Sequence, residues 1–566
     1  MMTDKKISNK NSEILIVGAG PVGLTLAILL KQYDVPFRII EKNNGPSNTT
    51  KAMAIHARTL EIFRELGIVD EATNQGFHIK TFSIQSEKKR ILNYDFSRLE
   101  TNWPILLSLP QPDVEKLMLQ RLESLGGTVE WNTTLLDIEQ TPDHDIHALI
   151  QKLDDQENAE WSSYRWLCAC DGARSLVRKK LKLDFSGSSY DSYFMLTDAD
   201  IKWDEPLDEG AFFLGSKEGY VAVAPIDGKG RYRLFFEIPH VLPPENEQPA
   251  LDLPTFQKLC NERGKKMTLS NLSSMTIASF QHRQINQLKH GSIFLVGDAA
   301  HIGSPIGGQW MNLGLSEAYN LGWKLAFVYK GYANSKLLDS YHDERSLVAQ
   351  EAEKTAHRLT KLITTKNPII VYFRNNLLSL ISNRRKIQNK LPSMISGHSY
   401  NYKQSSWVLN MLKSNEHLSW RQKFKKDYPR HPIPKAGELA PDIKLWMLPN
   451  VTSQELLLSS FYYHNYLLLI FTATDIGSLY VDSYLAMAQA ITMNYQGIEA
   501  RCVVDTIDIE NLNVIADPDW RLHSRYHAKR GNLVLIRPDG YIAFQGTDPD
   551  KLISFMKDKL SFLERV

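Results

Sequence analysis

The alternation of apolar and polar positions predicts an α/β arrangement from the start of the chain. Ile14 to Val17 is a run of aliphatic residues, as expected of a buried parallel strand. The pattern then predicts a helix from Val22 to Tyr33 and a second apolar strand from Pro36 to Glu41. Residues 49–67 contain a helix that Gly67 would cap, and residues 112–125 predict another helix.

The pattern changes in the middle of the chain. Trp161 to Cys170 is predicted to be one apolar strand. From about Tyr190 to Gln287, short alternating runs are separated by turn residues, which indicates an antiparallel sheet inserted into the α/β unit. A buried strand returns at Ser292 to Val296, and a helix is expected from about Leu313 to Lys330.

These changes divide the chain into five predicted segments. They are the first part of the α/β domain (1–188), the inserted sheet (189–287), the second part of the α/β domain (288–345), a fairly basic helical segment (346–428) and a small C-terminal α/β domain (429–566). Prolines and charges cluster around residues 425–440, as in a linker. The densest basic patch, Asn383 to Lys386, is better explained by a solvated helix face than by a phosphate or nucleic-acid site.

Three glycines after the first strand complete the pattern G-x-G-x-x-G. Gly18 permits a tight turn, Gly20 lets backbone approach a pyrophosphate, and Gly23 lets the helix lie close to the strand. Glu41 ends the second strand about 20 residues further on, where an acid would hold a ribose hydroxyl. Together these features predict dinucleotide binding, with a glycine-rich turn of another α/β domain as the alternative. The motif does not say which dinucleotide binds.

Composition narrows the class of protein. The 566 residues are too many for one core, and 43% hydrophobic and 23% charged residues are typical of a globular protein. A net charge of +2 does not favour nucleic acid or an anionic membrane as the main partner. The four cysteines make no disulfide framework, and we expect Cys168 and Cys170 to be buried strand residues rather than metal ligands. Without a signal peptide or a long apolar run, the expected compartment is the cytoplasm, with no membrane span.

Two further stretches carry candidate chemistry. Asp171-Gly172 follows the predicted strand at 161–170, and Asp298 follows the strand at 292–296. Asp298 could accept hydrogen bonds from polyol hydroxyls, and Gly307-Gly308 would let backbone lie flat against a planar ring. The helix that begins near Asn312 would direct its dipole at that ring. A helix-capping loop without a ligand is the alternative interpretation of this last stretch.

Taken together and in this order, the three stretches resemble the single-component flavoprotein aromatic hydroxylases, or group A flavin monooxygenases. This family includes phenol hydroxylase, polyketide hydroxylases and rifampicin monooxygenase. The resemblance runs from about Ile14 to Arg345 and is most specific in Gly297 to Ala326. Leu535 to Tyr541 resembles the thioredoxin-like C-terminal domain of the phenol hydroxylase branch, without its Cys-x-x-Cys. The resemblance implies a Rossmann-like FAD-binding domain, an inserted antiparallel-sheet substrate domain and a redox-inert thioredoxin-like domain.

The resemblance also implies the cofactor and its contacts. FAD would be bound, with NAD(P)H as a transient co-substrate that shares the site around Asp171-Gly172. Gln111 matches the glutamine that reaches the flavin side chain, and Met311 and Asn312 would offer backbone N–H groups to the isoalloxazine. The full set of expected cofactor contacts is Gly18, Ala19, Gly20, Pro21, Val22, Gly23, Glu41, Lys42, Lys51, Arg58, Gln111, Asp171, Gly172, Asp298, Pro305, Gly308, Trp310, Met311 and Asn312.

The implied reaction is hydroxylation of an aromatic or polyketide-like small molecule by O2 through a flavin C4a-hydroperoxide. An epoxidase, a Baeyer–Villiger-type oxygenase, an oxidase or a non-catalytic flavin-binding protein on the same scaffold are the alternatives. No catalytic side chain can be named, and a homodimer is left open as the oligomeric state. Lys51 stands where the family has arginine, and Trp310 replaces the glycine of Gly-Gly-Gln-Gly. We hypothesise that Trp310 contacts flavin or substrate.

Overall fold

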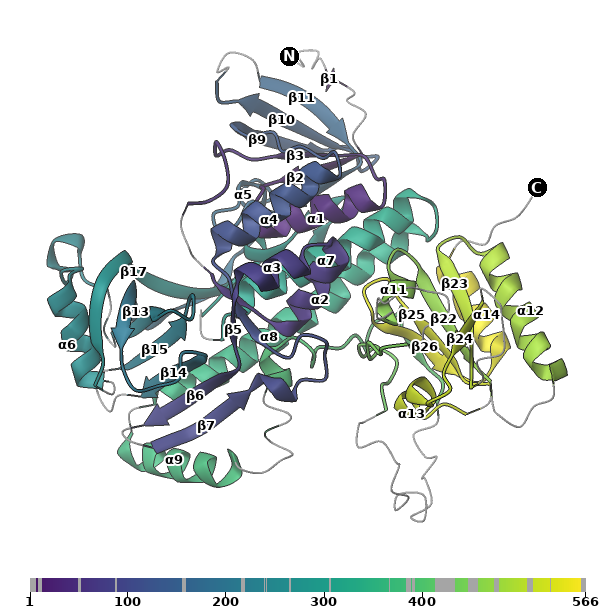
Figure 1. Cartoon of the computed structure of the whole chain (residues 1–566). Coiled ribbons are helices and arrows are strands. Elements are labelled where there is room, and N and C mark those ends of the chain that lie inside the picture. Colours follow the sequence, from purple (N-terminus) through teal and green to yellow (C-terminus); the bar gives the residue numbers. More distant parts are fainter. Residues whose placement is uncertain are drawn as a thin grey trace. The chain divides into compact units, whose positions relative to one another are not determined.

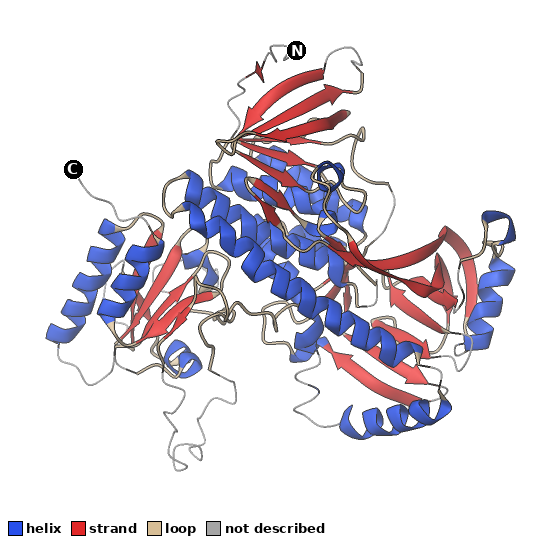
Figure 2. Ribbon diagram, turned by 180° about the vertical axis from the view of Figure 1, so that it is seen from behind, coloured by secondary structure: helices blue, strands red, loops and turns tan. Residues whose placement is uncertain are grey.

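The computed structural model forms two compact units (Figures 1 and 2). One comprises residues 1–319 and 345–399, and the other residues 320–344 and 400–566. The structure describes all residues except 1–6, 9–12, 49–51, 87–88, 155–158, 215–218, 239, 241, 264–265, 305–306, 366, 383–387, 389–391, 413–432, 446–456, 473–477, 506–512, 530 and 561–566. The basic patch at 383–386 and the linker prolines Pro429 and Pro432 therefore lie outside the described residues. In the described part, no helix is both long and apolar enough to cross a membrane.

A parallel sheet forms the centre of the first unit. Its strands, in spatial order, are β18 (Lys289–His290), β19 (Ile293–Leu295), β12 (Trp166–Ala169), β2 (Ile14–Val17) and β3 (Phe37–Ile40). All but β18 run parallel, and the side chains of β2 and β12 are fully or almost fully buried, as their continuous apolar runs predict. Helix α1 (Pro21–Gln32) connects β2 to β3 and packs against α4 (Gln111–Ser124). This is a Rossmann-like arrangement.

The stretch predicted as one strand at 161–170 is two strands in two sheets. β11 (Ala159–Tyr164) joins a four-stranded sheet with β1 (Ile7–Ser8), β10 (Ile146–Lys152) and β9 (Thr133–Gln140). β12 joins the parallel sheet instead. The chain changes sheet at Arg165, whose N–H donates to the Glu13 carbonyl. The burial pattern explains the division, since β11 begins with exposed residues whereas β12 is buried throughout.

The antiparallel sheet expected at 190–287 is present, and it is larger than predicted (Figure 1). Its eight strands, in spatial order, are β20 (His301–Ile302), β17 (Thr268–Gln284), β13 (Ser186–Lys202), β16 (Arg231–Ile238), β15 (Tyr220–Pro225), β14 (Glu209–Leu214), β6 (Thr81–Ser86) and β7 (Lys89–Asp95). The β6–β7 hairpin comes from outside the predicted insertion and joins through a parallel pairing of β6 with β14. Helix α6 (Leu253–Arg263) covers one face, where Phe256 and Cys260 enter the core.

The remaining elements of the first unit surround these sheets. A three-stranded sheet contains β4 (Ala54–Ile55), β8 (Leu106–Ser108) and β5 (Phe77–Ile79), and short helices are α2 (Ala57–Leu66), α3 (Val69–Gln75) and α5 (Leu176–Lys180). Gly67 caps α2 in the left-handed conformation, as predicted. Helix α7 (Gln309–Tyr329) begins four residues before the expected Leu313 and belongs to the first unit up to Tyr319. Helix α8 (Asp339–Thr364) belongs to it from Arg345, and α9 (Pro368–Ser382) follows.

The second unit has its own six-stranded sheet. The strand order is β21 (Leu409–Asn410), β26 (Ile542–Gly546), β25 (Leu533–Ile536), β22 (Tyr466–Phe471), β23 (Ile498–Val504) and β24 (Val514–Ala516). Its helices are α11 (Ser459–Tyr462), α12 (Ser478–Asn494), α13 (Arg521–Tyr526) and α14 (Pro549–Lys559). Parallel and antiparallel pairings both occur in this sheet. The thioredoxin-like assignment and the five predicted domain boundaries stay predictions.

A fully buried ionic network lies inside the second unit. Arg537 donates to both carboxylate oxygens of Glu344 (2.6 and 2.8 Å) and also to Asp539 (2.6 Å). Lys324 donates to Glu344 at 2.7 Å, and neither side chain is exposed. Burial alone would raise the pKa of Glu344, but Arg537 and Lys324 hold it far below its usual value. Burial lowers the pKa of Lys324 to about 8, against the opposing effect of Glu344.

We expect the two sides of this network to respond differently to substitution. Glu344→Gln would leave Arg537 and Lys324 to share Asp539 as their counter-ion and should lower the free energy of unfolding by about 3–5 kcal/mol. Lys324→Met should cost less than about 1 kcal/mol, because burial already lowers the pKa of Lys324 to about 8 and Glu344 keeps both hydrogen bonds from Arg537. Urea unfolding monitored by circular dichroism measures both variants. Equal losses would contradict this account of the network.

Candidate functional site

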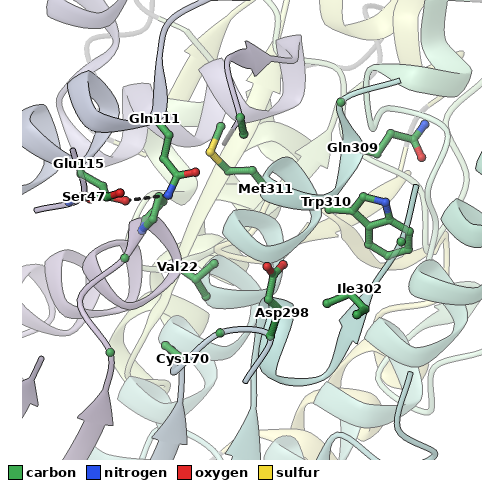
Figure 3. A pocket seen from close by; sticks show the side chains of 18 of the residues that line it. Val22, Ser47, Gln111, Glu115, Cys170, Asp298, Ile302, Gln309, Trp310 and Met311 are labelled. Atoms are coloured by element: carbon green, nitrogen blue, oxygen red, sulfur yellow. Dashed lines mark hydrogen bonds between the residues drawn. The ribbon is translucent and has the colours of Figure 1, made fainter. Parts of the chain in front are cut away.

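A large cavity runs through the first unit, with a volume of about 1370 Å3 (Figure 3). Its wall combines the glycine turn after β2, the end of β12, residues from 296–303 and 307–311, and one face of the eight-stranded sheet. The carboxyl ends of parallel strands meet at one edge of a sheet, so the three motifs come together although they lie far apart in the sequence. The cavity therefore joins the predicted nucleotide site to the predicted substrate sheet.

The three glycines of the turn are needed for different reasons. A Cβ atom on Gly18 would lie 2.4 Å from the Cys170 carbonyl oxygen, and one on Gly23 would lie 2.0 Å from the Gly18 carbonyl oxygen. Both glycines are thus required by the packing of the protein itself. A Cβ atom on Gly20 would meet no described atom within 4 Å, and Gly20 has an ordinary φ of −72°. Gly20 instead keeps open a cavity wall at the N-terminus of α1, where backbone N–H groups suit a pyrophosphate.

Glu41 and Asp171 provide acceptors beside this turn. One carboxylate oxygen of Glu41 accepts the Ala19 N–H at 2.9 Å and the other accepts from Asn43, so Glu41 holds the turn as well as lining the cavity. Asp171 Oδ2 accepts the N–H groups of Leu176 and Val177 at the start of α5. Its Oδ1 is buried and has no hydrogen-bond partner among the described residues. An oxygen in this state fits the hydroxyl groups of a bound nucleotide.

Gln111 is held by a residue that the sequence analysis missed. Its Nε2 donates to Glu115 Oε1 at 2.8 Å, and Glu115 Oε2 accepts the Ser47 N–H at 2.8 Å (Figure 3). Glu115 is only 3% exposed and lines the cavity with Gln111. The two side chains lie one helical turn apart on α4, and this i, i+4 spacing was the available signal.

The loop after β19 is fixed by a buried pair. Glu317 on α7 accepts the Gly297 N–H at 2.9 Å with one oxygen and pairs with His301 Nε2 at 2.7 Å through the other. Burial alone would lower the pKa of His301 and raise that of Glu317, but their mutual attraction reverses both shifts. The charged pair is therefore retained next to Asp298, which lines the cavity (Figure 3).

The Asn312 side chain has a structural role. Its Oδ1 accepts the His56 N–H and the Thr59 hydroxyl, and its Nδ2 donates to the Ala54 and Gly308 carbonyls, all within 2.9 Å. Three of these bonds tie the first turn of α7 to β4 and the start of α2, and the bond to Gly308 holds the residue before α7. Asn312 does not line the cavity, whereas the neighbouring Met311 does. The expected contact through the Asn312 backbone stays a prediction.

Trp310 forms part of the cavity wall. Its indole N–H donates to the Ser304 carbonyl at 2.7 Å, and a Cβ atom on Gly303 would lie 1.9 Å from the indole ring. The ring centroid is 5.4 Å from that of His301. The tryptophan that replaces the family glycine is therefore packed over Gly303 in one orientation, beside Met311 and Ile302 (Figure 3).

Apart from Asn312, the expected cofactor contacts divide into three groups. Those that line the cavity are Gly18, Ala19, Gly20, Pro21, Val22, Glu41, Lys42, Gln111, Asp171, Gly172, Asp298, Gly308, Trp310 and Met311. Gly23 and Arg58 lie outside its lining, and Arg58 instead pairs with Glu61 at 2.7 Å. Lys51 and Pro305 fall outside the described residues. Cys168 and Cys170 are buried at the end of β12, as predicted.

The part of the cavity that faces the eight-stranded sheet is strongly aromatic. Phe82 and Phe212 lie with ring centroids 5.0 Å apart, and Phe212 contacts Tyr220 edge-on. Burial raises the pKa of Tyr94 to about 12, so its hydroxyl is neutral. The aromatic lining residues are Phe82, Tyr94, Phe96, Phe212, Tyr220, Phe235 and Phe280. Such a wall suits a flat apolar ligand.

His56 lies between α2 and the glycine loop before α7. Its Nε2 is 2.8 Å from the Gly307 carbonyl oxygen, and its Nδ1 is buried without a partner among the described residues. Burial is the largest influence on this ring and lowers its pKa to about 4. At neutral pH His56 is therefore neutral, and Nε2–H donates to Gly307.

This pKa makes His56 a source of pH-dependent stability. As the pH falls from 6.5 towards 4, the unfolded chain binds a proton that native His56 does not, so stability is lost over that window, by about 3 kcal/mol in total. His56→Gln should remove this part of the pH dependence. Unfolding free energies measured from pH 7 to pH 4 test this, with His78→Gln, at an exposed position, as the matched control. Identical pH profiles for wild type and His56→Gln would contradict it.

Comparison with known proteins agrees with this geometry. The model of a family described as "FAD binding domain" matches residues 11–356. The 6-methylpretetramide 4-monooxygenase of Streptomyces rimosus is 29% identical over 94% of this chain and 90% of its own length. An uncharacterized aromatic compound monooxygenase of Bacillus subtilis is 36% identical over 62% of this chain and 68% of its own length.

A solved structure extends the likeness to the whole fold. The anhydrotetracycline hydroxylase OxyS from Streptomyces rimosus superimposes with a TM-score of 0.71 at 23% identity, over 97% of this chain and 98% of its own. The resemblance to the flavoprotein aromatic hydroxylases, which was based on the three motifs, is thus confirmed. The chain belongs to the FAD binding domain family, with FAD as its cofactor.

Proposed function

We propose that this chain is an FAD-dependent monooxygenase that uses NAD(P)H and O2 to hydroxylate an aromatic or polyketide-like small molecule. The observation that carries the proposal is one continuous cavity in which an open glycine turn leads to an aromatic chamber. The relatives from Streptomyces rimosus and Bacillus subtilis, both named as monooxygenases, support it. Epoxidation, Baeyer–Villiger oxidation and simple oxidation stay open as outcomes on this scaffold.

The residues present fit FAD at one end of the cavity. The open space beside Gly20 would take the pyrophosphate, and the unpartnered Asp171 Oδ1 would accept a hydroxyl. Gln111, held by Glu115, and Asp298 would contact the part of the cofactor that leads to the ring. When bound, the flavin supplies electron transfer from NAD(P)H and activation of O2.

The protein contributes position and shielding at the other end. The aromatic rings between β6 and β17 exclude water and would orient a flat substrate beside Trp310. The neutral Tyr94 hydroxyl could donate a hydrogen bond there without adding charge. We assign no general base for the reaction.

The function can be tested at Gly20. A side chain there meets no described atom of the protein but would occupy the proposed pyrophosphate position. Gly20→Val should therefore keep the thermal midpoint of the flavin-free protein while its FAD content falls by at least about ten-fold, since steric exclusion removes a bound state. Absorbance of the purified protein measures the flavin. NAD(P)H consumption stimulated by a panel of phenols should occur in wild type and disappear in Gly20→Val.

Two results would contradict the proposal. Wild-type protein that neither retains nor takes up FAD would remove its basis. Full FAD occupancy would favour the non-catalytic alternative if no phenol of the panel stimulated NAD(P)H consumption. Incorporation of labelled oxygen into the product separates hydroxylation from the other oxidations.

Trp310 provides a second test. Trp310→Gly should shift the flavin absorption bands and change the rate of NAD(P)H consumption, because the indole ring forms the wall of the cavity beside Met311. Trp520→Gly is a matched control, since Trp520 is exposed in the other unit and already has the left-handed backbone conformation that glycine adopts easily. An unchanged spectrum together with an unchanged rate would contradict a contact with flavin or substrate.

A further inference from the structure

Helix α9 exposes an unusual number of large apolar side chains. Ile369, Ile370, Tyr372, Phe373 and Leu377 are 54–67% exposed, on a helix of 15 residues. Ile369, Phe373 and Leu377 are spaced at i, i+4 and i+8, with the other two beside them, so they share one face. A group of this kind on one element differs from the scattered single apolar residues of an ordinary surface. We call these five residues the outer face of α9.

The opposite side of α9 is anchored to the protein. The helix lies along β7, the edge strand of the eight-stranded sheet (Figure 1). Asn375 donates to Ser86 at the end of β6 at 3.2 Å, and Arg374 is only 8% exposed. These contacts anchor the inner side of α9. The outer face is therefore not a core-facing surface that has become exposed.

The charge of the surrounding segment indicates what covers this face. Between Lys354 and Ser399 the sequence contains nine lysines and arginines and no aspartate or glutamate. The whole chain has a net charge of only +2, so positive charge is concentrated in this part of the sequence. Five of the nine residues, at 366, 384–386 and 390, lie outside the described part of the chain. A helix with an aromatic and aliphatic face, set in a basic segment, has the composition of helices that lie at the surface of anionic membranes.

Two other classes of partner fit less well. In a symmetric dimer through the outer face, a second copy would bring the same acid-free segment against itself, and like charges would repel. Nucleic acid would be attracted by the basic residues but gives exposed Ile369, Ile370 and Leu377 no apolar environment. An anionic lipid surface satisfies both the charge and the apolar residues.

We propose that the outer face of α9 binds peripherally to bilayers that contain anionic lipid, with Tyr372 and Phe373 inserted among the headgroups. The helix would lie in the membrane surface and would not span it. This proposal does not rest on the proposed function. The β6–β7 hairpin, against which α9 packs, also supplies Phe82 and Tyr94 to the cavity wall. The membrane would therefore lie near the aromatic chamber.

Flotation with lipid vesicles tests the proposal on the full-length protein. Wild type should float with vesicles of phosphatidylcholine and phosphatidylglycerol, much less with phosphatidylcholine alone, and binding should fall as salt rises. Tyr372→Ser combined with Phe373→Ser should reduce binding by at least about ten-fold, because the inserted apolar area is lost. Met493→Ser, at a position 59% exposed on α12 of the other unit, is the matched control and should bind like wild type.

Several outcomes would overturn the proposal. They are no binding by wild type, equal binding by the double variant, or binding that is indifferent to phosphatidylglycerol. Sedimentation velocity without lipid tests the alternative partner, a second copy of the chain. A wild-type dimer that the double variant converts to a monomer would assign the outer face to a second copy instead. Circular dichroism of the double variant should match wild type, since both substituted side chains are exposed.

Discussion

The site depends on one close approach of backbone to backbone. The turn at Gly18 lies directly against the carbonyl of Cys170 at the end of β12, and Gly23 lies against the carbonyl of Gly18. Any side chain at these two positions would separate α1 from the parallel sheet. The Val22 side chain on α1 lies close to Gly297 and Gly314, where a Cβ atom would come within 3.0 and 2.8 Å of it, so the start of α7 lies near the turn. Glycine packing therefore sets the width of the cavity where its three motifs meet.

The sequence was informative where one short segment carries both the structure and the chemistry. The strand, turn and helix around Gly18 could be predicted because the apolar run, the glycines and Glu41 all lie within about 30 residues. Asp171 and Asp298 could be placed because each follows a buried strand of the same sheet. For these residues, local pattern and parallel-sheet topology were sufficient.

The aromatic chamber could not be predicted in the same way. Phe82 and Phe212 meet only because β6 pairs in parallel with β14, across more than a hundred residues of sequence. Nothing in the local pattern of 81–86 indicates that partner. The division of 161–170 between two sheets and the role of the Asn312 side chain are likewise set by distant partners, Glu13 and Ala54 among them. These features depend on pairing between segments that are far apart in the sequence, and this pairing cannot be inferred from a single sequence.

Buried polar groups then hold the cavity in shape by different means. Charged pairs such as His301 and Glu317 persist because each group offsets the desolvation of the other. His56 has no carboxylate partner in the described structure and stays neutral instead, which keeps its hydrogen bond to Gly307. A neutral donor at this position adds no positive charge to a cavity whose other end is apolar. The electrostatic field of the cavity then arises from the start of α1 and from the charged residues of its lining, among them Asp171, Asp298 and Arg178.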